Sequence, residues 1–344
     1  MYTAFCRACV CACITLLAAC GAPAAPDTPL AELELNPTAA VSATATAAVA
    51  ATSEAISKLI EFEWQSSGKP EQLDSPADVA VDSKGDLYVV DGNNNRILKL
   101  NSQGELLKTW GKRGKSDGEF SFLYGGGGIA VDSQDNVYVA DSGNNRVQKF
   151  DPSGAFLLKW GDRGKGDGQF YSVFSLDVDQ DGNVYLLDDR NYRVQKFDSS
   201  GRFLLAFGEK GAADGEFNQQ AGDLALDAEG NVYVADRGNG RVQKFDPQGT
   251  FLNKFDSCGD LKAPFGQPYS LAVDAENSLY VVFFPGDTSR ICKLDRSGKQ
   301  VLIWGESGSA DGAFDGIGGV AVDGRGNVYV TDYGNRRVQK FRQP

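Results

Sequence analysis

The chain has 344 residues, and its 34 Lys and Arg against 46 Asp and Glu give a formal net charge of −12, which disfavours general binding to nucleic-acid phosphates. It contains no histidine, which excludes His-ligated zinc sites, Ser-His-Asp and Cys-His nucleophile systems and imidazole acid–base chemistry. The hydrophobic fraction of 42% excludes a wholly disordered chain, and 41 glycines favour a turn-rich β architecture over a helical one.

The N-terminal segment has the pattern of an export signal. Residues 9–19 form a short apolar stretch, well under the ~20 residues that span a bilayer, and Cys20 follows directly. The run 17–20, Leu-Ala-Ala-Cys, resembles the lipobox of bacterial lipoproteins. This resemblance implies that residues 1–19 are a signal peptide and that Cys20 carries diacylglyceryl, which anchors the protein in the bacterial cell envelope on the extracytoplasmic side. An ordinary signal peptide followed by a chance cysteine is the alternative.

The segment that follows Cys20 has the composition of a linker. It is built largely of Ala, Pro, Thr and Ser, and it is too polar to span a membrane. We therefore interpret residues 20–57 as a lipidated, disordered tether that holds the folded part away from the lipid surface.

From residue 58 onward, one unit repeats along the chain. Its clearest marker is a tyrosine between hydrophobic residues in a short apolar run. Neighbouring marker tyrosines lie 47 to 50 residues apart. This period, with apolar runs of strand length only, predicts a β-propeller with one blade per repeat. The six marker residues are Tyr88, Tyr138, Tyr185, Tyr233, Tyr280 and Tyr329.

Each repeat predicts four strands, which in the second copy are residues 128–132, 137–141, 146–151 and 156–161. The sixth copy ends one strand short, whereas residues 58–64 match the fourth-strand pattern before the first copy. We therefore predict that the N-terminal strand completes the last blade, so that no sheet edge stays open. The expected fold is all-β, a six-bladed β-propeller of four-stranded blades over residues 58–344.

Two motifs in these repeats resemble the NHL-repeat family of six-bladed propellers. One is Asn-Val-Tyr-Val-Ala-Asp followed by Asn-x-Arg-Val-Gln-Lys-Phe, at 136–150 and 231–245; the other is Trp-Gly-x-x-Gly-x-x-Asp-Gly-x-Phe, at 110–120 and 160–170. The resemblance covers residues 58–344 and implies the fold. It says little about function, because the family includes lyases, RNA binders, kinase sensor domains and scaffolds.

An aspartate and an arginine recur on either side of the turn between the second and third strands. Since a catalytic site is needed once and not in every blade, we interpret them as structural residues that close the loop and link blades by charge-assisted hydrogen bonds. The residues are Asp91, Asp141, Asp188, Asp236, Asp332, Arg96, Arg146, Arg193, Arg241, Arg290 and Arg337.

Departures from the repeat are the stronger functional candidates. Asp177 stands where the other copies have alanine, and a carboxylate on an innermost strand is costly unless it is paired or hydrated. Blades three and five have irregular loops, blade five is two residues longer, and a flexible four-glycine run is expected after Tyr124. In relatives these loops share one face, so we expect a binding surface around the channel mouth; drift in loops is the alternative. The candidate binding residues are Asp177, Asp189, Arg190, Tyr192, Tyr124, Phe283, Phe284 and Asp287.

Calcium is the one metal that the sequence raises. Calcium-dependent lactonases of the gluconolactonase type line a propeller channel with Glu, Asn and Asp, whereas the candidate channel residues here are only Asp78, Asp223 and Asp177. The run 179–183 resembles the start of a calcium loop but lacks its closing Glu, so we interpret it as a hairpin turn. We expect no resident cofactor and no metal site.

Cys258 and Cys292 are the other two cysteines of the exported chain. Export exposes them to an oxidising compartment, but the sequence leaves open whether they pair.

These observations lead to two functional hypotheses. The first is a lipid-anchored, extracytoplasmic and non-enzymatic module that binds a protein, peptide or glycan, touches the membrane only through its lipid, binds no nucleic acid and is monomeric. The alternative is a calcium-dependent, lactonase-like hydrolase with its metal in the channel. Amidating and streptogramin lyases on similar propellers depend on histidine, which this chain lacks.

Overall fold

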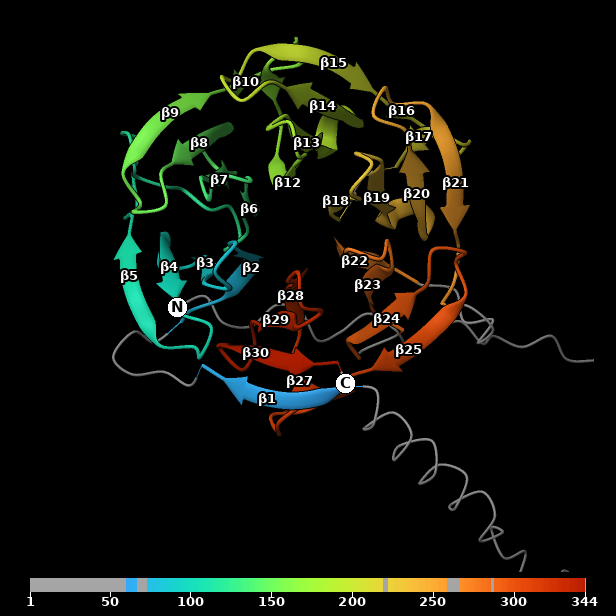
Figure 1. Cartoon of the computed structure of the whole chain (residues 1–344). Helices are drawn as coiled ribbons and strands as arrows, with labels where there is room; N and C mark the ends of the chain where they lie inside the picture. The colour runs from blue at the N-terminus through green and yellow to red at the C-terminus, as the bar shows by residue number, and fades with distance from the viewer. Residues whose placement is uncertain (1–59, 67–72, 219–221, 259–265, 286–287, 344) are drawn as a thin grey trace, which may run out of the picture. The chain divides into compact units, whose positions relative to one another are not determined.

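Six four-stranded antiparallel sheets stand around a common axis as the blades of a propeller, in chain order (Figure 1). The all-β, six-bladed fold predicted from the repeats is therefore confirmed. Cys20 and the residues for which a signal peptide and a tether are expected lie outside the described residues. No helix within the described part is long and apolar enough to cross a bilayer. The structure, a computed structural model, describes residues 60–66, 73–218, 222–258, 266–285 and 288–343.

In every blade the first strand is innermost and the fourth lies at the rim. Blades one to three consist of β2 (Pro76–Val81), β3 (Leu87–Asp91), β4 (Arg96–Leu100) and β5 (Leu106–Trp110); β6 (Ile129–Val131), β7 (Val137–Asp141), β8 (Arg146–Phe150) and β9 (Phe156–Trp160); and β12 (Val173–Val178), β13 (Val184–Asp188), β14 (Arg193–Phe197) and β15 (Phe203–Phe207). Blades four to six consist of β18 (Leu224–Leu226), β19 (Val232–Asp236), β20 (Arg241–Phe245) and β21 (Phe251–Phe255); β22 (Pro268–Val273), β23 (Leu279–Phe283), β24 (Arg290–Leu294) and β25 (Gln300–Trp304); and β28 (Ile317–Val322), β29 (Val328–Asp332), β30 (Arg337–Arg342) and β1 (Glu61–Gln65).

The N-terminal strand closes the ring, as the strand count predicts. β1 pairs antiparallel with β30, so that Glu61 lies opposite Arg342, a residue 281 positions away in sequence. Trp64 extends the closure to blade one, because its indole Nε1 donates to the Ser102 carbonyl at 3.0 Å. β1 therefore covers the outer edge of blade six and contacts the next blade.

The hydrophobic core lies between neighbouring blades. Second strands such as β7 are buried along their whole length because both faces of the blade are covered, which explains their uninterrupted apolar sequence. Outer strands such as β9 alternate between partly buried and exposed positions. A phenylalanine from each Asp-Gly connection also fills this space. These are Phe120, Phe170, Phe217 and Phe314.

Several connections between blades contain regular structure in their described residues. Three of them contain a two-stranded parallel ribbon, and the loops after β13 and β19 each contain one turn of 3₁₀ helix. These elements are β10 (Asp162–Arg163), β11 (Gln169–Phe170), β16 (Glu209–Lys210), β17 (Glu216–Phe217), β26 (Glu306–Ser307), β27 (Ala313–Phe314), η1 (Asp189–Asn191) and η2 (Arg237–Asn239).

Among the described residues, five blades have a buried aspartate at the end of the second strand. The carboxylate of each forms hydrogen bonds with the connection that precedes the blade. In blade two, Asp141 accepts hydrogen bonds from Arg146 Nε at 2.7 Å and Asn144 Nδ2 at 2.9 Å, which closes the loop. It also accepts the backbone N–H of Ser121, while Arg146 donates to the Glu119 carbonyl, both in the connection from blade one. The predicted structural role is therefore confirmed. The fully buried carboxylates are Asp91, Asp141, Asp188, Asp236 and Asp332.

A disulfide joins Cys258, just after β21, to Cys292 in β24, with Cα atoms 6.1 Å apart. Both residues are buried in the core between blades four and five. The bridge therefore fastens the start of the blade-four to blade-five connection at the one blade that lacks the buried carboxylate.

The closure is tested by Trp64→Ala. The indole lies over the turn glycine Gly104, where an added Cβ would come within 2.7 Å of the ring, so its removal leaves a gap between blades six and one. We expect the free energy of unfolding to fall by about 2 kcal/mol, less than for a fully buried tryptophan because Trp64 is half-buried. Urea denaturation measures this loss. Leu107→Ala, on the exposed rim of β5, is the control and should change stability by less than ~0.5 kcal/mol; equal effects would contradict the assigned role.

Candidate functional site

The innermost strand of each blade turns an open edge toward the channel, where its backbone N–H groups need acceptors that no neighbouring strand supplies. Side chains of the preceding blade provide several of them. Asp78 Oδ2 accepts the N–H of Ile129 in blade two at 3.0 Å, and Ser270 Oγ accepts that of Val320 in blade six at 3.2 Å. One residue per blade occupies this position, and we call this set the axial ring. In blade order its members are Asp78, Gly128, Ser175, Asp223, Ser270 and Gly319.

Asp223 is fully hydrogen-bonded within the axial ring. Its Oδ1 accepts from Ser175 Oγ at 2.5 Å and from the Leu224 N–H at 2.8 Å. Its Oδ2 accepts from Ser270 Oγ and the Leu271 N–H, both at 2.9 Å. Four donors fill the roughly four acceptor positions of a carboxylate, so Asp223 joins blades three, four and five. Burial raises the pKa of Asp223.

Asp78 has unused hydrogen-bonding capacity. Its two oxygens accept one backbone N–H each, from Val79 at 2.9 Å and Ile129 at 3.0 Å, which leaves about two acceptor positions open. Burial, followed by the charge of Asp223, raises the pKa of Asp78 well above its usual range. An ammonium or hydroxyl group placed near Asp78 would relieve this cost.

Asp177 lies two residues beyond the axial ring on β12. It accepts the N–H of its neighbour Val178 at 2.8 Å and the N–H of Leu226 in blade four at 2.9 Å. Burial, together with the charges of Asp223 and Asp179, raises the pKa of Asp177 to about 7. Asp177 therefore joins two blades at the channel and does not line the cavity described next.

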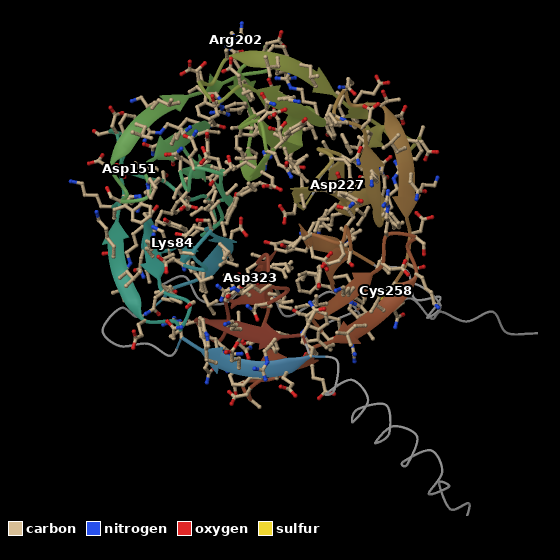
Figure 2. All side chains as sticks on the ribbon, in the orientation of Figure 1. Lys84, Asp151, Arg202, Asp227, Cys258 and Asp323 are labelled. Carbon is tan, nitrogen blue, oxygen red and sulfur yellow. A yellow bond between two sulfur atoms is a disulfide. The ribbon has the colours of Figure 1, made fainter. Side chains whose placement is uncertain are left out.

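A cavity of about 570 Å³ opens at the channel mouth, above the axial ring. In each blade, the residue just before the axial-ring residue lies at the rim of this cavity. Four of these six residues are Ala or Gly, and their small size leaves the space open. The two large ones are Phe174 and Tyr269. Figure 2 shows side chains from all six blades reaching toward the axis, while Arg202 and Asp151 lie at the outer rim. The six mouth residues are Ala77, Gly127, Phe174, Gly222, Tyr269 and Gly318.

Three arginines border this cavity. Arg163 Nη2 donates to Tyr171 Oη at 2.9 Å, and the guanidinium groups of Arg163 and Arg190 lie 4.8 and 5.6 Å from the Tyr171 ring centroid. The hydrogen bond from Arg163 and the two positive charges lower the pKa of Tyr171. Arg237, from η2, lies 5.4 Å from the Tyr269 ring. Within the described residues, none of the three forms an ion pair with a carboxylate.

A second hollow of about 480 Å³ continues from the first, with which it shares Tyr124, Arg237 and Tyr269. Gln267 fixes Arg237 there, since its Oε1 accepts from Arg237 Nε at 3.0 Å and Nη2 at 2.6 Å. Phe284 packs edge-on against Tyr269, with ring centroids 5.6 Å apart. The first cavity takes residues from all six blades, and the second hollow adds further residues of blades one, five and six.

Tyr124 is the most exposed large side chain of this face, at 91%. Its backbone is left-handed, with φ of 54°, a conformation that costs a bulky residue about 1 kcal/mol. The glycines after it allow close packing: a Cβ on Gly127 would lie 2.6 Å from Phe122, and one on Gly128 would lie 2.7 Å from the Phe174 carbonyl. Contact distances therefore explain Gly127 and Gly128, while the flexibility expected of this run stays a prediction.

The structure brings most of the predicted site residues to one face, on second-to-third-strand loops, blade connections and the starts of innermost strands. Tyr124, Asp189, Arg190, Asp78 and Asp223 line the first cavity, and Phe284 lines the second. The other candidates do not line either cavity, and Asp287 and Cys20 lie outside the described residues.

Two candidates are corrected by their packing. Phe283 is only 2% exposed in β23, where it faces the core between blades four and five, so it is unavailable as a surface contact. Tyr192 packs against the blade-three and blade-four core, and Lys210 lies 5.5 Å from its ring. Both aromatic side chains therefore stabilise the packing between neighbouring blades, because each fills space in the core beside an irregular loop.

Sequence reasoning missed several cavity residues, including the two mouth aromatics, Tyr171 and two of the arginines. Phe174 and Tyr269 could have been found by aligning the repeats, because the other four blades have Ala or Gly at this position. Tyr171 and Arg237 stand at positions that differ from blade to blade, and Arg163 has the same residue type as Arg113 in the preceding connection, so the repeat alone gave no signal for them.

The axial carboxylates do not form a good calcium site. All acceptor positions of Asp223 already face hydrogen-bond donors, which a cation would have to displace. No group of three or more Asp, Glu, Cys or His suited to a metal occurs among the described residues.

Comparisons with known proteins agree on the repeat and the fold. Residues 73–100, 127–150, 218–245 and 314–341 match the family description "NHL repeat". A human protein, NHL repeat-containing protein 3, is 37% identical over 59 residues, which is 16% of this chain and 17% of that protein.

Solved structures resemble this chain in fold alone. A streptogramin B lyase superposes with a TM-score of 0.58 at 12% identity, over 83% of this chain and 98% of the lyase. A gluconolactonase from Xanthomonas campestris superposes with a TM-score of 0.56 at 15% identity, over 79% of this chain and 88% of that enzyme. A Bacteroides thetaiotaomicron protein of unknown function reaches 0.59 at 16% identity, over 82% of this chain and 75% of its own.

The raised pKa of Asp177 predicts a pH-dependent stability. Between pH 4 and 7 the folded state keeps a proton that the unfolded state, with a pKa near 3.8, has lost, so raising the pH destabilises the fold. Asp177→Asn removes this titration. We compare the free energy of unfolding of the variant with that of wild type at each pH, and expect the difference to shift in favour of the variant by about 2 kcal/mol between pH 4 and pH 8. This value takes about 1.4 kcal/mol per pKa unit and is reduced because Asp177 is partly exposed. Urea denaturation at both pH values measures the change.

Asp151→Asn is the control for this experiment. Hydrogen bonds from Ser153 and Ala155 lower the pKa of Asp151, so this carboxylate does not destabilise the fold as the pH rises, in contrast to Asp177. The difference from wild type should be the same at pH 4 and pH 8. A pH-independent difference for Asp177→Asn as well would contradict the assignment.

Proposed function

We propose that this six-bladed propeller of NHL repeats is a binding module that holds its ligand at the channel mouth. The observation that carries the proposal is the convergence of blade-specific side chains on one cavity of about 570 Å³, a size typical of ligand sites. The repeat itself places small residues there, whereas the two mouth aromatics and the arginines Arg190 and Arg237 are peculiar to single blades. Packing does not require such side chains at these positions, which favours selection for binding.

The proposed setting is the extracytoplasmic side of a bacterial envelope, where Cys20 carries lipid and residues 20–57 act as the tether. The lipobox-like run before Cys20 supports this, and the bridge between Cys258 and Cys292 suits an oxidising compartment. The protein would act as a monomer, with its loop-rich mouth presented to a protein, peptide or glycan.

A strained, exposed tyrosine is a second observation in favour of a ligand-binding site on this face. Tyr124 costs stability through its left-handed backbone and makes little compensating burial. Such a residue is expected where a ligand supplies the missing contact.

A calcium-dependent lactonase activity is the alternative that the sequence raised. The similarity to a gluconolactonase extends to the fold only, and the hydrogen-bonded state of Asp223 disfavours a cation there. Calorimetry with calcium distinguishes the two functions, because one site tighter than roughly 10⁻⁵ M would favour the hydrolase.

The binding proposal is tested by Tyr124→Gly and Tyr269→Ala in protein purified from the envelope. Compounds retained by each variant are extracted and identified by mass spectrometry. Glycine tolerates the left-handed backbone and blade one carries Ala77 at the position of Tyr269, so both variants should fold with stability within about 1 kcal/mol of wild type. We expect a compound retained by wild type to fall about tenfold in each variant, since tenfold corresponds to 1.4 kcal/mol.

Leu252→Ala, on the exposed rim strand β21, is the matched control and should retain the compound fully. Equal recovery from wild type and both mouth variants would refute binding at the mouth.

A further inference from the structure

The cavity at the channel mouth is electrically divided. Its outer border carries Arg163, Arg190 and Arg237 together with one acidic residue, Asp189, while Asp78 and Asp223 lie at its base. The base carboxylates follow the mouth residues directly in sequence, so they lie about 3 Å deeper along their strands. A ligand that fills the cavity therefore meets positive charge at the outside and carboxylates at the axis.

The outer border keeps an excess of positive charge, three arginines against Asp189, although the chain has a net charge of −12. Arg163 and Arg190 lie over the ring of Tyr171, and one N–H of Arg163 donates a hydrogen bond to the phenolic oxygen. Each guanidinium has five N–H donors, so most remain available for a planar acceptor. The exposed fork of Arg190 and the neighbouring Arg163 together suit a carboxylate, which takes parallel hydrogen bonds from guanidinium groups.

The negative pole is also incomplete. Asp78 has about two acceptor positions open, and it repels Asp223 across the channel. A primary ammonium offers three donors and a positive charge, so it satisfies both needs at once. Asp223 adds attraction through its charge, although its own hydrogen-bonding positions are filled.

Two aromatic side chains stand on the rim of the same cavity. Phe174 from blade three and Tyr269 from blade five are separated by Gly222 of blade four, so an apolar side chain can lie between them. Aromatic walls with a few convergent polar groups are typical of sites that fix a ligand's orientation.

We propose that the mouth cavity binds a short peptide as a zwitterion, with its carboxylate on Arg163 and Arg190, its ammonium at Asp78, and an apolar side chain between Phe174 and Tyr269. This ligand class rests on the proposed binding function and makes it specific. A ligand with one charge only would leave one pole of the cavity desolvated and unpaired, which costs affinity.

The test uses glycine peptides of two to five residues that end in phenylalanine, because the length series samples the separation of the two charges. Each is measured by calorimetry with the full chain, as free peptide, N-acetylated peptide and C-terminal amide. We expect at least one free peptide to bind with a Kd below about 1 mM. N-acetylation and C-terminal amidation should each weaken the binding of that peptide at least tenfold, as expected for the loss of a hydrogen bond to a charged group.

Two variants assign each charge to its pole. Arg190→Gln should weaken the free peptide about tenfold and should leave the amide unchanged, because the amide has no carboxylate to lose. Asp78→Asn should weaken the free peptide and leave the acetylated form unchanged, and its thermal unfolding checks that the Ile129 N–H is still capped. Arg113→Gln is the matched control, since Arg113 occupies the position of Arg163 in the preceding connection but does not line the cavity.

The proposal is overturned if no free peptide saturates up to about 10 mM, or if the blocked peptides bind as tightly as the free ones. Its failure is distinct from that of the binding function. A retained compound that depends on Tyr124 and Tyr269 would keep the mouth as a binding site for another ligand class, even if every peptide failed to bind.

Discussion

The buried carboxylate at the end of the second strand is the interaction on which the ring depends. It ties the loop of its own blade to the connection from the preceding blade, so each such contact fixes two blades at once. Asp141 does this through Arg146 and the Ser121 N–H. A carboxylate with no exposed surface is tolerable only because charged and neutral donors surround it. Blade five has Phe283 at this position, and there the disulfide between Cys258 and Cys292 joins it to the connection from blade four.

A second set of carboxylates serves the open inner edge. Asp78, Asp177 and Asp223 accept backbone N–H groups of the next blade's first strand, and in doing so they gather negative charge near the axis. The charge is costly, as the raised pKa values of Asp78 and Asp223 indicate. Only Asp78 both lines the mouth cavity and keeps open acceptor positions. The same group can therefore stabilise the ring and meet a ligand, which explains how a structural position acquires a binding role.

Much of the fold follows from the sequence, because a 48-residue period leaves few choices. Six marker tyrosines set the blade number, and residues 58–64 supplied the missing strand that β1 turns out to be. The site was less predictable. Arg190 and Tyr124 stood out as departures from the repeat, but burial decides whether a departure is functional. Phe283 fills the core while Phe284, its neighbour, reaches the surface. Arg163 and Tyr171 meet only through the connection between blades, which periodicity does not describe.

The central claim is that the repeat builds the ring and that blade-specific residues at its mouth bind a ligand. The most direct measurement is a crystal structure of the protein isolated from its own envelope without added ligand. The account predicts electron density for a bound molecule between Arg190 and Asp78, in contact with Phe174 or Tyr269. A mouth that holds only ordered water, together with a bound molecule on another face of the propeller, would contradict it.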